Sequence, residues 1–199
     1  MSLITLLEYA SVLVFAITGA LVASRAQLDL VGFAFIACLT ALGGGTLRDL
    51  ILSQPVFWLE DTQTLGLAVA GGFTAFFFHR WLENFRPLRW ADAFGMALFA
   101  VTGAAKAMSL GFGWPVVLIM GTMTASAGGL LRDVVANEEP LLLKKDIYAT
   151  AALMGSLVYF LLKLSAVEET FAFGGGLLAA FMIRALAIIF KLSLPRSPF

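Results

Sequence analysis

Seven apolar segments, each long enough or nearly long enough to cross a bilayer, constrain this 199-residue chain more than any other feature. Because a transmembrane helix needs about 20 apolar residues, we expect spans at 3–23, 30–47, 64–82, 92–110, 114–131, 147–164 and 170–191. Hydrophobic residues make up 60% of the chain and charged residues 13%, whereas a soluble domain is about half apolar and about a quarter charged. The composition excludes a disordered chain and a disulfide scaffold. It predicts an all-α polytopic membrane protein with a single membrane domain over 1–199.

Lysine and arginine are divided unevenly between the two sides of this arrangement. Nine fall on one side: Arg25, Arg80, Arg86, Arg89, Arg132, Lys144, Lys145, Lys191 and Arg196. Arg48, Lys106 and Lys163 fall on the other side, and Arg184 lies within the last segment. Since cytoplasmic loops are enriched in basic residues, we expect a multi-pass protein of the cell's inner (plasma) membrane with its N-terminus outside and its C-terminus cytoplasmic. With a net charge of zero, no nucleic-acid partner is expected.

The sequence repeats itself at an offset of 84 residues. Phe-Ala-Ile-Thr-Gly-Ala at 15–20 recurs as Phe-Ala-Val-Thr-Gly-Ala at 99–104. Thr-Ala-Leu-Gly-Gly-Gly-Thr-Leu-Arg-Asp at 40–49 recurs as Thr-Ala-Ser-Ala-Gly-Gly-Leu-Leu-Arg-Asp at 124–133. Each copy covers three spans, an odd number, so the second copy crosses the membrane in the opposite direction. The pattern predicts two inverted three-helix repeats, 3–82 and 92–164, followed by a seventh helix at 170–191.

The repeated glycines indicate a special backbone in the second span of each repeat. Gly43, Gly44 and Gly45 end one apolar run, and Gly128 and Gly129 end the other. Consecutive glycines favour a kink or a break in a helix, and non-helical backbone at membrane depth is tolerated only inside protein or beside a water-filled cavity. We therefore expect a helix break that lines a pore. Close helix packing through small residues is the alternative.

An Arg-Asp pair follows each glycine group. Charges at membrane depth are costly and usually face a bundle interior or an aqueous path, so we expect Arg48, Asp49, Arg132 and Asp133 to line or gate a pore. Arg48 is expected to pair with Asp133 or Asp49, and Arg132 with the other acid. A new helix after each break would hold the two aspartates in its first turn, where the helix dipole favours an anion. The alternative is that both pairs are interfacial loop charges.

Three further residues are pore candidates. Thr18 and Thr102 are equivalent in the two repeats, and their hydroxyls either face a shared aqueous path or bond their own helix backbone. Lys106 lies one helical turn after Thr102, whereas its counterpart in the first repeat is Val22. Lys106 is either a gating charge or a side chain that snorkels to the interface.

Signs of enzymatic chemistry are missing from the sequence. His79 is the single histidine and Cys38 the single cysteine, so no metal-ligand set is expected. We find no catalytic Ser/His/Asp or cysteine arrangement and predict that the chain is not an enzyme and has no cofactor. The four tryptophans, Trp58, Trp81, Trp90 and Trp114, lie near the ends of predicted spans, as in an aromatic belt.

With its duplicated motifs at 43–49 and 127–133, the chain resembles the prokaryotic trimeric intracellular cation (TRIC) channels, whose repeats are also known as glycine-transporter-like domains. The resemblance implies a homotrimer in membrane lipids with one ion path per subunit, through which potassium and also sodium pass transiently. It further implies kinks at the glycines of the second and fifth spans. Two departures are Ala127 in place of the first glycine of the second motif and the absence of the Lys-Glu-Val triplet of animal members.

Three functions remain open from the residues alone. Inverted repeats suit a passive cation channel and a secondary transporter of a small solute such as glycine equally well. A structural membrane protein is the third possibility. Threonine hydroxyls and freed carbonyl groups are suitable ligands for potassium or sodium, whereas cation preference itself is implied only by the resemblance.

Overall fold

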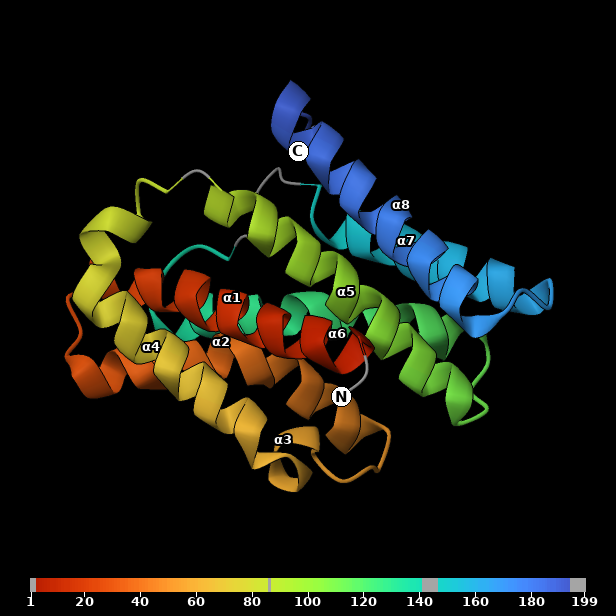
Figure 1. The fold of residues 1–199 in the computed structure, drawn as a ribbon, viewed down its shortest axis with the longest axis horizontal. Helices are drawn as coiled ribbons and strands as arrows, with labels where there is room; N and C mark the ends of the chain where they lie inside the picture. The colour runs from red at the N-terminus through yellow and green to blue at the C-terminus, as the bar shows by residue number, and fades with distance from the viewer. Residues whose placement is uncertain (1–2, 86, 141–146, 194–199) are drawn as a thin grey trace, which may run out of the picture.

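The computed structural model describes residues 3–85, 87–140 and 147–193 of the chain. The helices within these ranges are α1 (Leu3–Arg25), α2 (Leu30–Ile51), α3 (Phe57–Glu60), α4 (Thr62–Leu82), α5 (Pro87–Ser109), α6 (Trp114–Val135), α7 (Ala149–Leu164) and α8 (Glu169–Phe190) (Figure 1). Four basic residues used for the predicted orientation lie outside the described residues: Arg86, Lys144, Lys145 and Arg196.

The seven long helices each overlap one predicted span, and α3 is an additional short helix that the sequence pattern did not reveal. Within the described residues, five helices are long and apolar enough to cross a membrane: α1, α2, α4, α6 and α8. Of the remaining long helices, α5 carries three charged side chains and α7 has 16 residues. Helices α2 and α6 continue about one turn beyond their predicted ends, because the Arg-Asp pairs belong to the helices rather than to loops.

The long helices form two three-helix bundles and a single outer helix. Helices α1, α2 and α4 pack against one another, and α5, α6 and α7 do the same. The bundles meet where α1 packs on α5 and α2 packs on α6, while α8 covers α5 and α7. Equivalent helices of the two bundles run in opposite directions, as α1 and α5 do in Figure 1. The predicted all-helical fold with two inverted repeats and a seventh helix is confirmed.

The repeat extends to the loop backbone. Gln27 after α1 and Gly111 after α5 both have positive φ angles, 54° and 80°, and they are 84 residues apart. Ser53 after α2 and Asn137 after α6 are also 84 residues apart and have φ angles of 53° and 54°. Corresponding helices of the two bundles are therefore followed, at equivalent positions, by a residue in the left-handed conformation.

The predicted helix break is wrong. Both α2 and α6 are continuous through their glycines and through the Arg-Asp pairs, since a continuous helix satisfies its own backbone hydrogen bonds in apolar surroundings. Asp49 and Asp133 consequently lie near the ends of these helices rather than at the start of new ones. A helix C-terminus disfavours an acid, so other groups must compensate both carboxylates. A kink in either helix stays a prediction.

Candidate functional site

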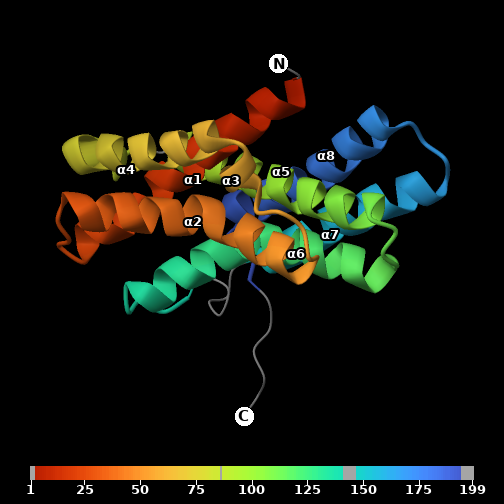
Figure 2. The same cartoon turned by 90° about the horizontal axis from the view of Figure 1, so that it is seen from below.

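The two bundles meet where α2 crosses α6, and both views place these helices side by side (Figures 1 and 2). A Cβ added to Gly44 would overlap the carbonyl oxygen of Thr124, and one added to Gly128 would overlap that of Thr40. Gly44 and Gly128 are equivalent in the repeats, as are Thr40 and Thr124. Only glycine permits this approach of backbone to backbone, so the packing alternative for these glycines is confirmed.

The Thr-Gly motifs of α1 and α5 also admit a neighbouring side chain. A Cβ on Gly19 would overlap the Thr40 side chain, and a Cβ on Gly103 would overlap that of Thr124. Thr18 Oγ1 donates to Phe15 O at 3.2 Å and Thr102 Oγ1 donates to Phe99 O at 3.3 Å. Both hydroxyls are therefore placed to bond their own helix backbone, while Thr18 also lies 3.5 Å from Asp92 Oδ1. Whether they face a shared aqueous path stays a prediction.

Four charged side chains meet at one end of the crossing, and we call Glu8, Arg48, Asp49 and Lys106 the α2 cluster. The completely buried Asp49 accepts through Oδ1 from Arg48 Nε and from Lys106 Nζ, each at 2.8 Å. Its Oδ2 accepts from the backbone N–H of Phe57 at 3.0 Å. Glu8 lies near enough for the charges of Arg48 and Lys106 to act on it. Two acids thus face two bases.

The α6 cluster, which consists of Asp92, Arg132, Asp133 and Arg184, is its counterpart in the other bundle. Arg132 Nε donates to Asp133 Oδ1 at 2.7 Å, and both side chains are buried. Asp92 is acted on by the charges of Arg132 and Arg184, and it accepts from Thr18 Oγ1 at 3.5 Å. The guanidinium of Arg184 lies over the Tyr148 ring, 5.1 Å from its centre. This cluster also contains two acids and two bases.

The equal number of acidic and basic side chains in each cluster helps to explain how these residues are tolerated between apolar helices. Removing ions from water is costly, and close pairing with further hydrogen bonds offsets much of that cost. Removing one partner of a buried pair leaves an uncompensated charge, which typically costs about 3–5 kcal/mol. Both clusters are therefore expected to be sensitive to any substitution that changes their net charge.

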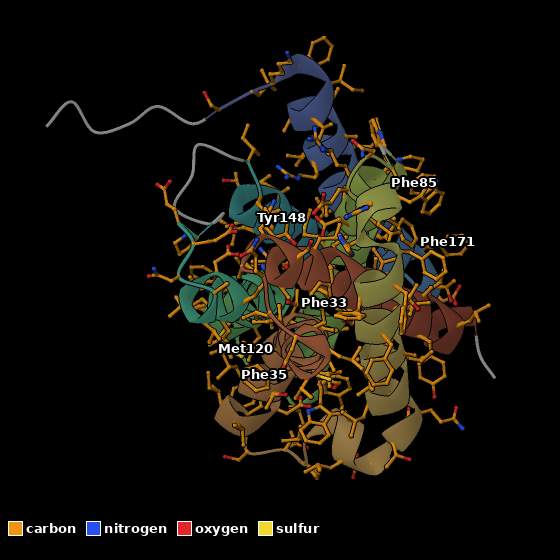
Figure 3. All side chains as sticks on the ribbon, turned by 90° about the vertical axis from the view of Figure 1, so that its left-hand side faces the viewer. Phe33, Phe35, Phe85, Met120, Tyr148 and Phe171 are labelled. Carbon is orange, nitrogen blue, oxygen red and sulfur yellow. The ribbon has the colours of Figure 1, made fainter. Side chains whose placement is uncertain are left out.

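A wide vestibule leads to the α6 cluster. Its volume is about 1400 Å³, and Asp92, Arg132 and Arg184 line it. The other charged lining residues are Arg25, Glu83, Arg89 and Lys191. Figure 3 views the molecule from the vestibule end, with Phe85 of the vestibule wall and Tyr148 at the start of α7 labelled.

A second, much smaller cavity lies directly beyond the vestibule. Its volume is about 30 Å³, enough for one or two water molecules. Asp92 and Arg132 line both spaces, while Thr40, Ser126 and Asp133 provide further polar groups to the small cavity. Phe15 closes one side of it and packs against Phe99 with ring centres 5.1 Å apart. The small cavity therefore adjoins the vestibule at Asp92 and Arg132 and reaches Thr40 and Ser126 at the α2–α6 crossing.

The structure brings the predicted site residues into two groups rather than one. Arg48 and Arg132 each pair with the aspartate that follows them in their own repeat, which is one of the two pairings predicted. The ammonium of Lys106 binds Asp49, so it is directed into the cluster instead of toward the interface. Whether these residues line or gate a pore stays a prediction.

Three members of the clusters were missed as site residues from the sequence. Glu8 and Asp92 are 84 residues apart and so belong to the repeat, but their different side chains concealed the match. Arg184 was not a site candidate, because the repeated motifs do not extend to α8. It reaches the α6 cluster, whose position equivalent to Lys106 is occupied by Val22. In the described ranges, no three His, Cys, Asp or Glu side chains are grouped to hold a metal ion.

Comparison with known sequences shows that the chain is similar to bacterial membrane proteins. The family model described as "Glycine transporter" matches residues 5–80 and again 89–163. The chain is 35% identical over 202 residues to a UPF0126 membrane protein of Vibrio cholerae, covering 98% of this chain and 82% of that one. It is also 35% identical over 196 residues to the UPF0126 inner membrane protein YadS of Escherichia coli K12, covering 95% and 93%.

The chain is also similar to solved structures of membrane channels. A chain from a study of conductance through TRIC cation channels is 36% identical and superposes with a TM-score of 0.95, covering 100% of this chain and 98% of the other. The TRIC trimeric intracellular cation channel orthologue from Rhodobacter sphaeroides is 39% identical with a TM-score of 0.89, covering 96% and 100%. Sequence and fold are therefore similar over nearly the whole chain.

Proposed function

We propose, because the chain belongs to the prokaryotic TRIC channel family, that it conducts potassium and sodium through a path within each subunit of a homotrimer. Membership in a family of ion channels also means that the chain is not an enzyme. The relatives with solved structures are named as cation channels, and one of them as trimeric. The finer statements on ions, path and assembly are our inference for this chain.

One observation carries the proposal: hollow space with charged side chains in its lining reaches the α2–α6 crossing within a single subunit. The vestibule and the small cavity share Asp92 and Arg132, and both lie within one chain. The α2 cluster lies at the other end of the α2–α6 crossing. A path that joins the two clusters would pass between the bundles, which is where inverted repeats commonly hold their transported solute.

The distribution of basic residues supports an orientation. Five of the seven charged residues that line the vestibule are basic, and basic residues are enriched on the cytoplasmic side of membrane proteins. We propose that the vestibule opens to the cytoplasm, with the N-terminus outside, and that the protein resides in the inner membrane, as its relative YadS is named.

A secondary transporter of glycine is the second candidate, because the matching family model carries that description. Purified protein in liposomes distinguishes the two functions. A channel predicts potassium efflux that follows the gradient and needs no glycine. A transporter predicts saturable glycine uptake and no glycine-independent potassium efflux, and that pair of results would contradict the proposal. Chemical crosslinking in detergent that stops at the trimer would support the assembly, and monomers alone would argue against it.

A further inference from the structure

The short helix α3 closes over the α2 cluster. The N–H of Phe57, its first residue, donates to Asp49 Oδ2 at 3.0 Å. The indole Nε1 of Trp58 donates to Thr46 Oγ1 at 2.9 Å, and Thr46 Oγ1 in turn donates to Leu42 O at 2.8 Å. Helix α3 is therefore fixed to the last two turns of α2 by its backbone and by a side chain. The hydrogen bond to Thr46 gives Trp58 a role besides the interfacial belt predicted for it.

The ring of Phe57 lies close to both the α2 backbone and the Arg48 guanidinium. Arg48 Cζ is 5.7 Å from the ring centre, within the range of a cation–π contact. On α2, a Cβ added to Gly45 would overlap the Phe57 ring. The absence of a side chain at residue 45 thus lets the ring lie directly on the helix, where it holds Arg48 beside Asp49.

A small cavity lies beside the equivalent glycine of the other repeat, where residue 141, the counterpart of Phe57, lies outside the described residues. Gly129 of α6 is equivalent to Gly45, and it lines the small cavity of about 30 Å³ together with Arg132 and Asp133. The nearest atom to a Cβ added there is Arg132 Nη2, at 3.6 Å. Among the described residues, the Phe57 ring lies against Gly45 of α2, whereas Gly129 of α6 faces the small cavity.

A second attachment holds the far end of α3. Asp61, which follows α3, accepts from Tyr9 Oη at 2.7 Å and from Thr64 Oγ1 at 2.8 Å. The hydrogen bond from Tyr9 and, to a smaller extent, the one from Thr64 lower the pKa of Asp61 below its usual 3.8. Asp61 is therefore ionised at neutral pH and keeps α3 attached to α1. Helix α3 is held at both ends, by α2 and by α1.

We propose that Phe57 is the barrier residue at the α2-cluster end of the ion path and the positioning residue for Arg48. This inference rests on the proposed cation path and assigns its closure. The ring excludes water from beside Gly45 and keeps Arg48 on Asp49. Withdrawal of α3 would uncover Gly45 and release Arg48 from the ring, and ions pass only in that state.

Single-channel recording of Phe57→Ala tests the barrier, with Leu59→Ala as the matched control. Leu59 lies on the same short helix and is 63% exposed. We expect Phe57→Ala to raise the open probability by about tenfold, the equivalent of about 1.4 kcal/mol lost from the closed state. Leu59→Ala should leave it unchanged. Equal open probabilities for the two variants would overturn the assignment.

Gly45→Ala offers an independent route, because its methyl group displaces the ring without removing it. We expect this variant to raise the open probability as well. In the Phe57→Ala background, Gly45→Ala should add no further increase, since the displaced ring is already absent. An equal increase in both backgrounds would show that Gly45 acts independently of Phe57 and would contradict the proposal. If Phe57→Ala does not fold, Gly45→Ala and Trp58→Phe replace it as test variants. Trp58→Phe removes the hydrogen bond from α3 to Thr46. An unchanged open probability in both variants would overturn the proposal.

Thiol accessibility separates this proposal from the cation path itself. Thr46→Cys in a Cys38→Ser background is treated from outside with a membrane-impermeant maleimide; because Thr46→Cys removes the hydroxyl that accepts from Trp58, all labelling rates and open probabilities are compared within this background. We expect slow labelling with Phe57 present or with Leu59→Ala, and labelling about tenfold faster with Phe57→Ala, in parallel with the open probability. Faster labelling without any unitary current would reject the cation path and keep the barrier. Unchanged labelling would reject the barrier whatever the currents show.

Discussion

At the scale of single residues, the carboxylate of Asp49 binds groups from both repeats. It accepts from Arg48 of its own helix, from Lys106 of the other repeat and from the backbone of Phe57. The first repeat has Val22 at the position that Lys106 occupies in the second repeat. One lysine therefore makes the α2 cluster unlike a simple copy of the α6 cluster, and it is the residue that most directly controls the net charge there.

Lys106→Val reproduces the residue of the other repeat and leaves the α2 cluster with one unbalanced negative charge. A negative charge beside a cation path raises the local cation concentration. We expect the unitary potassium conductance to rise by about two- to threefold at low salt, with a smaller effect at high salt because ions screen the charge. Lys163→Val is the control, since Lys163 pairs with Glu169 away from both clusters. A conductance equal to that of the wild type would place Lys106 outside the path.

At the scale of helices, the glycines of α2 and α6 act through packing. They allow the two helices to approach until backbone lies against backbone, with Thr40 opposite Gly128 and Thr124 opposite Gly44. Helix packing in membranes depends on such small residues, because lipid provides no hydrophobic force between helices. The close contact where α2 crosses α6 thus sets the distance between the two bundles.

Gly44→Ala tests whether the close contact between α2 and α6 limits stability. The added methyl group would overlap the Thr124 carbonyl oxygen, and overpacking of this kind typically costs about 1–3 kcal/mol. We expect a lower thermal unfolding midpoint in detergent. Gly174→Ala is the matched control, because its added Cβ would meet nothing within 4 Å and alanine favours a helix by about 1 kcal/mol over glycine. If Gly44→Ala is as stable as Gly174→Ala, the close crossing does not limit stability.

The same helices show what sequence patterns can and cannot predict here. Apolar length and the 84-residue offset were enough to predict seven long helices, their inversion and the pairing of Arg48 with Asp49 and of Arg132 with Asp133 as one of two arrangements. Glycine runs are compatible with a break or with close packing, and only the position of the opposing helix decides between them. Contacts made by Phe57 and Arg184 were not predictable, since both residues come from segments outside the repeated motifs.

At the scale of the whole molecule, the chain consists of two antiparallel copies of one bundle with a neutral charge cluster at each end of their interface. The vestibule enters from the end of the α6 cluster, and α3 covers the α2 cluster. Thirteen basic and thirteen acidic residues balance over the chain, and eight of these charges form the two clusters. Charge is scarce in this protein and concentrated where the bundles meet.

The central claim is that a single subunit conducts potassium and sodium along this interface. The most direct measurement is the reversal potential of unitary currents from purified protein in a planar bilayer under a potassium chloride gradient. We predict discrete openings that reverse close to the potassium equilibrium potential, and that persist when sodium replaces potassium. Currents that reverse at the chloride potential, or an absence of unitary currents together with saturable glycine uptake, would contradict the account.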